Sequence, residues 1–125
     1  MKPLALDHIV LACRDVAATR DFYSRVLGLT PREEHPDKWS LVVGASKISL
    51  QDAAHMPPVA VGTFPGAANL CLLVEENLEV VRACLAKHGV APVSPTQVRD
   101  GARGPILSFH IHDPDGNLVE IGRLE

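Results

Sequence analysis

The chain has 125 residues, of which 46% are hydrophobic and 22% charged, and its formal net charge is -3. These values are typical of one globular domain with a single core, and they exclude a disordered chain. The absence of a basic run argues against a nucleic-acid partner, and the lack of an apolar signal core or long apolar run predicts a cytoplasmic protein with no membrane partner.

An internal repeat organises the chain. Residues 8–28 align with residues 69–89 without a gap, at a constant offset of 61. Each copy begins with a short apolar strand, followed by an N-cap residue, Asp15 or Asn77. An amphipathic helix follows in each copy and ends at a glycine, after which a proline stops the pattern.

Short β-rich segments follow each helix. One further strand is predicted after each glycine, near residues 30–34 and 90–93. A hairpin comes next in each copy, and these hairpins pair residues 41–43 with 48–51 and residues 107–112 with 118–122. Glycines in both connecting turns supply the positive φ that tight turns require.

The sequence therefore predicts an α+β fold of two βαβββ modules. The expected boundaries within a single domain 1–125 are module one 5–52, linker 53–68 and module two 69–123. One helix on one face of each sheet leaves the other faces to form a curved sheet around a central cleft. The alternative is a ferredoxin-like repeat with a filled core and no cleft.

Three cysteines, Cys13, Cys71 and Cys84, are too few and too widely spaced for a disulfide framework or a Cys-x-x-Cys metal site. Their apolar surroundings predict that they are small buried side chains. A reactive thiol would need an electropositive, partly exposed setting instead.

A carboxylate inside an apolar strand is the strongest indication of chemistry. Glu120 lies between Val119 and Ile121, so it must be paired, solvated in a cleft or bound to a metal, unless it faces solvent. If the turn 113–117 closes symmetrically, His110 faces Glu120 across the hairpin. His110 then either orients the carboxylate or acts as a general base, and both residues are candidate catalytic groups.

The repeat supplies further candidates at equivalent strand positions. His8 opens the first strand and aligns with Asn69 in the second copy. The strand equivalent to that of Glu120 contains Ser49 and Gln51 on one face. We prefer Gln51 because its amide oxygen has the longer reach toward a cation.

Three segments resemble the vicinal oxygen chelate superfamily, which includes glyoxalase I, fosfomycin- and bleomycin-resistance proteins and extradiol dioxygenases. They are Leu6-Asp7-His8-Ile9-Val10-Leu11, the helix with Phe22-Tyr23 and Leu27-Gly28-Leu29, and Asp113-Pro114-Asp115-Gly116-Asn117-Leu118-Val119-Glu120. Within the superfamily the chain is most similar to the glyoxalase domain-containing protein 5 group, through residues 65–71 and 101–108.

The resemblance implies a glyoxalase-like fold, often a homodimer, with a divalent metal held by His8, Gln51 and Glu120. Such a donor set suits Zn, Ni, Mn or Fe acting as a Lewis acid on a small oxygen-chelating substrate, in a lyase or isomerase reaction. Asn69 stands where an extradiol dioxygenase has a second His, which argues against ring cleavage. The alternative function is metal-free binding of a small molecule, as in bleomycin resistance.

Four residues are candidate substrate contacts. Asn69 is expected near the metal position. Arg99 and Arg103 flank Gly101 on the predicted loop before residues 107–112 and are suited to an anionic substrate. Trp39, the only tryptophan, either lines the cleft or covers the core.

Overall fold

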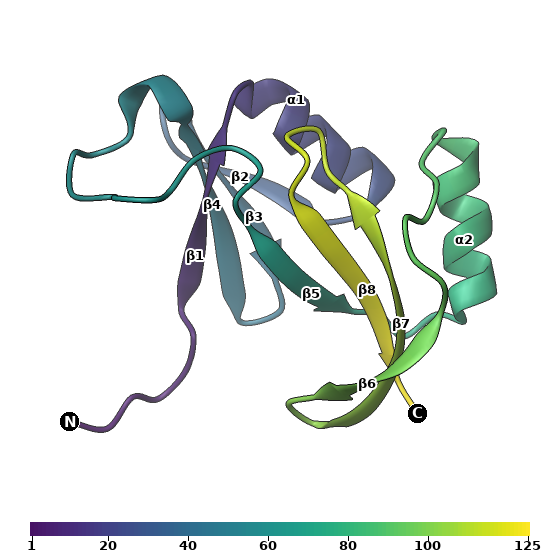
Figure 1. The fold of residues 1–125 in the computed structure, drawn as a ribbon. Coiled ribbons are helices and arrows are strands. Elements are labelled where there is room, and N and C mark those ends of the chain that lie inside the picture. Colours follow the sequence, from purple (N-terminus) through teal and green to yellow (C-terminus); the bar gives the residue numbers. More distant parts are fainter. The chain divides into compact units, whose positions relative to one another are not determined.

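The computed structural model describes residues 1–125, which form two units, Met1–Ala67 and Ala68–Glu125. Each unit contains one mixed four-stranded sheet and one main helix, and the first unit has an additional short 3-10 turn (Figure 1). The predicted α+β fold with two βαβββ modules is therefore confirmed, and the boundary between the units falls at the end of the expected linker. None of the helices meets the length and hydropathy that a membrane-spanning helix requires.

The sheet of the first unit has the strand order β1-β4-β3-β2. β1 pairs with β4 in parallel, and the other pairs are antiparallel. The elements of this unit are β1 (His8–Cys13), α1 (Val16–Asp21), the π-helical turn η1 (Phe22–Val26), β2 (Thr30–His35), β3 (Lys38–Val43), β4 (Ser46–Asp52) and the 3-10 turn η2 (Ala53–His55).

The second unit repeats this arrangement with the strand order β5-β8-β7-β6. β5 pairs with β8 in parallel, and the remaining pairs are antiparallel. Its elements are β5 (Asn69–Leu73), α2 (Leu78–Lys87), β6 (Gln97–Gly101), β7 (Gly104–His112) and β8 (Leu118–Leu124).

Both helices begin where the sequence predicts. The Asp15 carboxylate accepts a hydrogen bond from the backbone of Ala18 at 3.0 Å, and the Asn77 carboxamide accepts one from Glu79 at 2.8 Å. These bonds satisfy backbone N–H groups that have no partner inside the helix. Gly28, with φ of 75°, follows the first helical segment and lets the chain turn into β2.

The core of each unit lies between its helix and one face of its sheet. In the first sheet, Leu11, Ile48 and Leu50 are buried on the face against which α1 packs. In the second, Phe109 and Ile121 are register partners and are both buried. Because side chains alternate along a strand, the residues between these positions lie on the opposite face of each sheet, here called the open face.

A buried turn joins β7 to β8. The Asp113 carboxylate accepts hydrogen bonds from the backbone N–H of Asp115 and of Asn117, both at 2.9 Å, and from Asn117 Nδ2 at 2.8 Å. Asn117 Oδ1 in turn accepts a bond from the backbone of Ala68 at 2.9 Å. The turn therefore fixes the β7–β8 register and ties this hairpin to the residue that precedes β5.

The strand predicted near residues 90–93 is wrong, because the strand after α2 is β6, at Gln97–Gly101. Pro92 and Pro95 lack the backbone N–H that a sheet ladder needs, so Val93 makes a single backbone bond to the His110 carbonyl at 2.8 Å and the regular ladder starts beyond Pro95. Arg99 consequently lies in β6 rather than in a loop, and Arg103 lies in the turn between β6 and β7.

The prediction for the cysteines is correct for Cys13, which is buried, and wrong for Cys71 and Cys84, which are exposed. Cys71 belongs to the open face of the second sheet, and Cys84 lies on α2. All three are free thiols, as the spacing predicts.

Candidate functional site

Glu120 lies on the open face of the second sheet. Its neighbours in β8, Val119 and Ile121, are buried at 0% and 2% exposure against the helix side, so the Glu120 side chain points the other way. Its partners in the ladders are His110 on β7 and Cys71 on β5. The predicted pairing of His110 with Glu120 is confirmed, because the turn 113–117 does close symmetrically.

The Glu120 carboxylate is mostly buried and is surrounded by polar groups. Its side chain is 16% exposed, and the Ser108 hydroxyl donates a hydrogen bond to Oε1. Arg99 Nε lies 3.6 Å from Oε1, and His110 Nε2 lies 3.8 Å from Oε2. A carboxylate removed from water needs such compensation, so Glu120 is held in place rather than simply solvated.

Ser94 determines how His110 presents its ring. The Ser94 hydroxyl oxygen accepts a hydrogen bond from the His110 backbone N–H at 2.9 Å and lies 2.9 Å from His110 Nδ1. The hydroxyl hydrogen has a second acceptor, the Pro95 carbonyl, but at 3.4 Å. The shorter distance favours donation to Nδ1, which leaves the ring proton on Nε2, toward Glu120. This tautomer suits His110 to orienting the carboxylate.

A pocket of about 370 Å³ opens beside Glu120 in the second unit. Its charged lining comes from Arg99, Arg103 and Glu120, which are three of the predicted site residues, and from Asp100. The remaining lining residues are Cys71, Leu73, Gly101, Ala102, Ile106 and Leu124. The volume lies in the lower part of the range of small-molecule sites, roughly 300 to 1,000 Å³.

The thiol of Cys71 is electrostatically tuned by this environment. Although the residue as a whole is exposed, partial burial of its thiol raises the pKa of Cys71 to about 11, and the negative charge and hydrogen bond of Glu120 add to the effect. The thiol therefore stays protonated near neutral pH, and it contributes a soft apolar surface to the pocket rather than a nucleophile.

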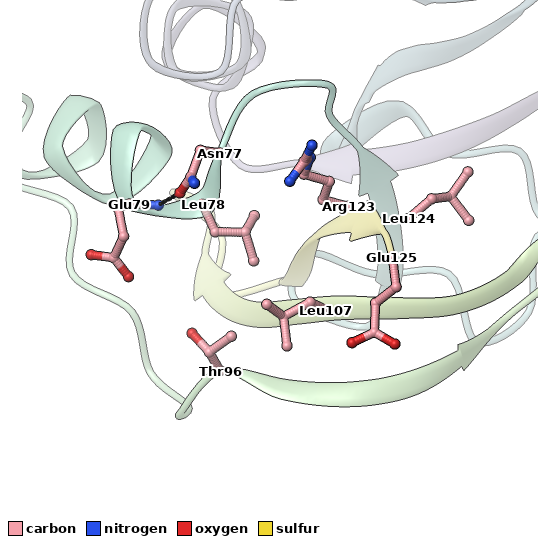
Figure 2. Close-up of a pocket in the computed structure, with 8 residues that line it drawn as sticks. All are labelled: Asn77, Leu78, Glu79, Thr96, Leu107, Arg123, Leu124 and Glu125. Atoms are coloured by element: carbon pink, nitrogen blue, oxygen red, sulfur yellow. Dashed lines mark hydrogen bonds between the residues drawn. The ribbon is translucent and has the colours of Figure 1, made fainter.

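A second pocket, of about 270 Å³, lies in the same unit but contains none of the predicted site residues. Figure 2 shows Asn77 and Glu79 at the start of α2, with Arg123 and Glu125 at the end of the chain. Asn77 already caps the helix through the Glu79 backbone. The pocket beside Glu120 is the better candidate because it holds a mostly buried carboxylate with organised partners.

His8 lies at the start of β1 in the first unit. Its Nδ1 is 2.7 Å from the Asp7 carboxylate, and this hydrogen bond lowers the pKa of Asp7. A carboxylate on one ring nitrogen fixes the tautomer and leaves the other nitrogen available as a ligand. Asn69, the equivalent residue in the second unit, is exposed at the start of β5, on the same face as Cys71 and Glu120.

The structure does not bring Gln51 next to His8. His8 pairs with Lys47, whereas Gln51 pairs with Ala12, which separates them by about 13 Å along the sheet. Ser49 pairs with Val10 and lies between them on the same open face. Gln51 Nε2 donates a hydrogen bond to the carbonyl of His55 at 3.2 Å.

Ser49 is the register equivalent of Glu120. Val10 pairs with Ser49 in the first sheet, as Cys71 pairs with Glu120 in the second. The sequence comparison weighed Ser49 against Gln51 and preferred the longer side chain. The repeat alone does not fix the strand register. Knowledge of the register would have shown that Ser49, and not Gln51, is equivalent to Glu120.

A charged cluster occupies the first sheet near His8. Glu34 Oε1 accepts hydrogen bonds from Lys47 Nζ and the Ser40 hydroxyl, both at 2.7 Å, and from Arg32 at 2.9 Å. These donors lower the pKa of Glu34 to about 2, with Lys47 the largest contributor. The sequence did not predict this cluster because Glu34 lies within the irregularity between Glu33 and His35, where strand alternation does not tell which face a side chain occupies.

Trp39 belongs to the face of β3 that α1 covers. The guanidinium of Arg20 on α1 lies 4.0 Å from the centroid of the Trp39 ring. Trp39 alternates with the buried Ser40 and shares its face with the buried Leu41. Of the two roles that the sequence left open, its position corresponds to covering the core.

The donor chemistry fits a divalent metal in part. His8 offers an imidazole whose ring is oriented by a hydrogen bond to Asp7, and Glu120 offers a carboxylate that is hydrogen-bonded by Ser108. Imidazole and carboxylate are both common ligands of Zn and related ions. They belong to different units. No group of three or more His, Cys, Asp or Glu side chains is arranged to hold a metal ion.

Comparison with known proteins defines the class. Residues 5–121 match the family described as the Glyoxalase/Bleomycin resistance protein/Dioxygenase superfamily. The chain therefore belongs to this superfamily.

Two relatives cover most of the chain. The glyoxalase domain-containing protein RDO1 of Mycosarcoma maydis is 36% identical over 118 residues, which is 94% of this chain and 66% of that protein. The virulence protein STM3117 of Salmonella typhimurium is 36% identical over 119 residues, 94% of this chain and 83% of that protein. The chain thus spans just under two thirds of the first relative. These likenesses support the superfamily rather than the glyoxalase domain-containing protein 5 group in particular.

Solved structures agree on the fold. The crystal structure of STM3117 has a TM-score of 0.93 at 34% identity and covers 100% of both chains. Lactoylglutathione lyase from Agrobacterium tumefaciens and the antibiotic-binding protein TnmS3 from a Streptomyces species share the fold at 20% identity, with TM-scores of 0.72 and 0.79. The same fold therefore occurs in a lyase and in a binding protein, and it does not choose between them.

Proposed function

We propose that this protein is a metal-dependent enzyme of the lyase or isomerase type that acts on a small substrate chelating through neighbouring oxygens. The observation that carries the proposal is the Glu120 carboxylate, mostly buried on an open sheet face and held by Ser108, His110 and Arg99 beside a pocket. A strongly organised carboxylate in a pocket is the arrangement expected of a ligand or a general base.

The metal would be Zn, Ni, Mn or Fe, held by His8 and Glu120. When bound, it would supply Lewis-acid polarisation of a substrate carbonyl and stabilise an enolate. The predicted third donor is Gln51. Ser49, nearer to His8 in the strand register, is the competing position.

The protein side chains have separate tasks in this proposal. Glu120 accepts a substrate proton at Oε2, while Ser108 keeps Oε1 engaged. His110, its Nδ1 hydrogen-bonded by Ser94, directs Nε2 toward Oε2 and orients the carboxylate. Asp7 keeps the His8 ring in one tautomer. The pocket residues Arg99 and Arg103, with Asn69 on the same sheet face, are the proposed substrate contacts.

Metal content of the purified protein tests the proposal. We expect roughly one equivalent of divalent metal per chain in the wild type, and a loss of at least tenfold in affinity for His8→Ala and Glu120→Gln, since each removes a direct ligand. Glu125→Gln, at the second pocket, is the matched control and keeps its metal. Equal metal content in all four proteins would refute the assignment.

The third donor is resolved by a second pair of variants. Ser49→Ala and Gln51→Ala each remove one neutral oxygen donor from the same open face of the first sheet. Metal affinity should fall for the residue that ligates and remain unchanged for the other. If both variants bind metal like the wild type, the first unit contributes only His8.

A metal-free binding protein is the second candidate. It is favoured by the neutral Asn69 at the position equivalent to His8 and by the lack of three gathered metal-binding side chains. Chelator-treated protein would then take up a small ligand tightly, with an affinity that added Zn, Ni, Mn or Fe does not change. A homodimer also stays a prediction, which sedimentation equilibrium measures.

A further inference from the structure

One buried donor of the pocket beside Glu120, although it is close to that carboxylate, lacks a hydrogen-bond acceptor. Arg99 Nε is buried and makes no hydrogen bond. Its nearest acceptor is Glu120 Oε1, and at 3.6 Å this pair is beyond hydrogen-bond distance. Elsewhere the same guanidinium makes only a long bond, from Nη2 to Gln97 Oε1 at 3.3 Å. A buried N–H group without an acceptor is energetically unfavourable. A ligand oxygen placed next to Arg99 Nε would remove this cost.

A second cation lines the same pocket. Arg103 lies in the tight turn that joins β6 to β7, and both arginines line the cavity. Two carboxylates also line the pocket, Glu120 and Asp100. Oε1 of Glu120 accepts from Ser108 and lies 3.6 Å from Arg99 Nε, and neither carboxylate forms a hydrogen bond with either arginine. The pocket therefore offers guanidinium groups to an incoming anion.

The rest of the pocket is apolar and small. Leu73, Ile106 and Leu124 line it together with the protonated thiol of Cys71. Gly122 lies beneath them, and a Cβ there would meet Ile106 Cδ1 at 3.1 Å and Cys71 Sγ at 3.5 Å. This apolar lining favours a ligand with a hydrocarbon body.

From these features we infer that the pocket is a subsite for an organic monocarboxylate with a short apolar chain. The carboxylate accepts from Arg99 Nε and from Arg103, and the apolar part lies along Cys71, Leu73 and Ile106. A planar guanidinium pairs well with a planar carboxylate. The neighbouring charge of Glu120 disfavours a dianionic phosphate more than a monoanion.

This inference rests on the proposed function in that it names the substrate class of the same site, a carboxylic acid whose acid group lies beside Glu120. The subsite itself uses only residues of the second unit and contains no metal ligand other than Glu120. It therefore binds its ligand in metal-free protein, and the two proposals fail separately.

The experiment is an NMR titration of chelator-treated full-length protein with hexanoate, hexanamide and hexyl phosphate. Hexanoate should shift the Arg99 Nε–H resonance and the backbone amides of residues 99–103 saturably, at a concentration near about 1 mM. Hexanamide, which has the same shape without the charge, should bind about tenfold more weakly or worse. Hexyl phosphate should bind more weakly than hexanoate.

Substitutions of the two arginines test which side chains bind hexanoate. Arg99→Gln should lower the hexanoate affinity about tenfold. Arg99→Lys keeps the charge without the planar donors, so its hexanoate affinity should lie between those of the wild type and Arg99→Gln. Arg103→Gln should also weaken binding, whereas Arg123→Gln, a matched change in the second pocket, should not. Unchanged amide dispersion in each variant shows that it is folded.

Several results overturn the inference. They are equal binding of hexanoate and hexanamide, tighter binding of hexyl phosphate, equal effects of Arg99→Gln and Arg123→Gln, or no saturable shift well above about 1 mM. Hexanoate binding by a protein that takes up no metal would refute the proposed function alone. Metal binding without hexanoate binding would refute the subsite alone.

Discussion

Replacing Asp113 with Ala tests whether the β7–β8 turn is a main source of stability in the second unit. The carboxylate accepts three hydrogen bonds, from two backbone N–H groups and from Asn117 Nδ2. Asp113 is 6% exposed and Asn117 is 2% exposed, so water does not replace these bonds when the acceptor is removed. The substitution leaves three donors without their acceptor.

The expected loss of stability follows from the number of donors that lose their acceptor. A hydrogen bond to a charged group contributes about 1.5 to 3 kcal/mol, and bonds that share one carboxylate are not fully additive. We therefore expect Asp113→Ala to lower the free energy of unfolding by about 3 to 5 kcal/mol. This is a large share of the roughly 5 to 15 kcal/mol that stabilises a domain, and it lowers Tm by about 10 to 20 °C.

Urea unfolding followed by far-UV circular dichroism measures this loss, with the slope m compared between variants. Asp113→Asn keeps one oxygen for the backbone donors but turns an amide N–H toward Asn117 Nδ2, so it should lose about half as much. Glu76→Ala, an exposed change in the same unit, should stay within about 0.5 kcal/mol of the wild type. An Asp113→Ala protein within about 1 kcal/mol of the wild type would refute the reasoning.

Three further predictions use the pKa values and the close packing. The pKa of Glu34 is lowered to about 2 by its donors, chiefly Lys47, so the stability it contributes is complete above about pH 5 and is lost as the pH falls toward 2. Glu34→Gln should flatten the urea midpoint over this acid range, and an unchanged pH dependence would contradict the assignment. Since the pKa of Cys71 is raised to about 11, iodoacetamide at pH 8 should modify Cys84 on the order of a hundredfold faster than Cys71, as peptide mapping reports. Similar rates would mean that burial and Glu120 do not raise the pKa of this thiol. A Cβ at Gly101 would meet the Gly104 carbonyl at 2.7 Å, so Gly101→Ala should cost about 1 to 3 kcal/mol in urea unfolding and should loosen the β6–β7 hairpin.

The sequence predicted correctly those features that depend on short-range interactions, such as turn closure and helix capping. The facing of His110 and Glu120 follows from a symmetric turn at residues 113–117, and the register confirms it. The helix starts at Asp15 and Asn77 follow from side-chain capping of backbone groups within three residues. Both depend only on interactions between residues close in sequence.

Predictions that depend on distant pairing were weaker. The parallel pairing of β1 with β4 is set by contacts between strands about 40 residues apart, and the repeat did not reveal that Ser49, not Gln51, matches Glu120. The partners Ser94 and Ser108 of the site were missed for the same reason. Serines are common surface residues, and nothing in their sequence neighbourhood marks them as hydrogen-bonded to His110 and Glu120.

The two copies of the repeat differ in length, and the difference is confined to one stretch. Equivalent residues are offset by 61 at the first strand of each copy, His8 and Asn69, and by 71 at the last, Ser49 and Glu120. The second copy has therefore gained, or the first has lost, ten residues between these strands. That interval contains the β6–β7 hairpin with Arg99 and Arg103. The length difference between the copies therefore falls in the part of the second unit that supplies both arginines of the pocket beside Glu120.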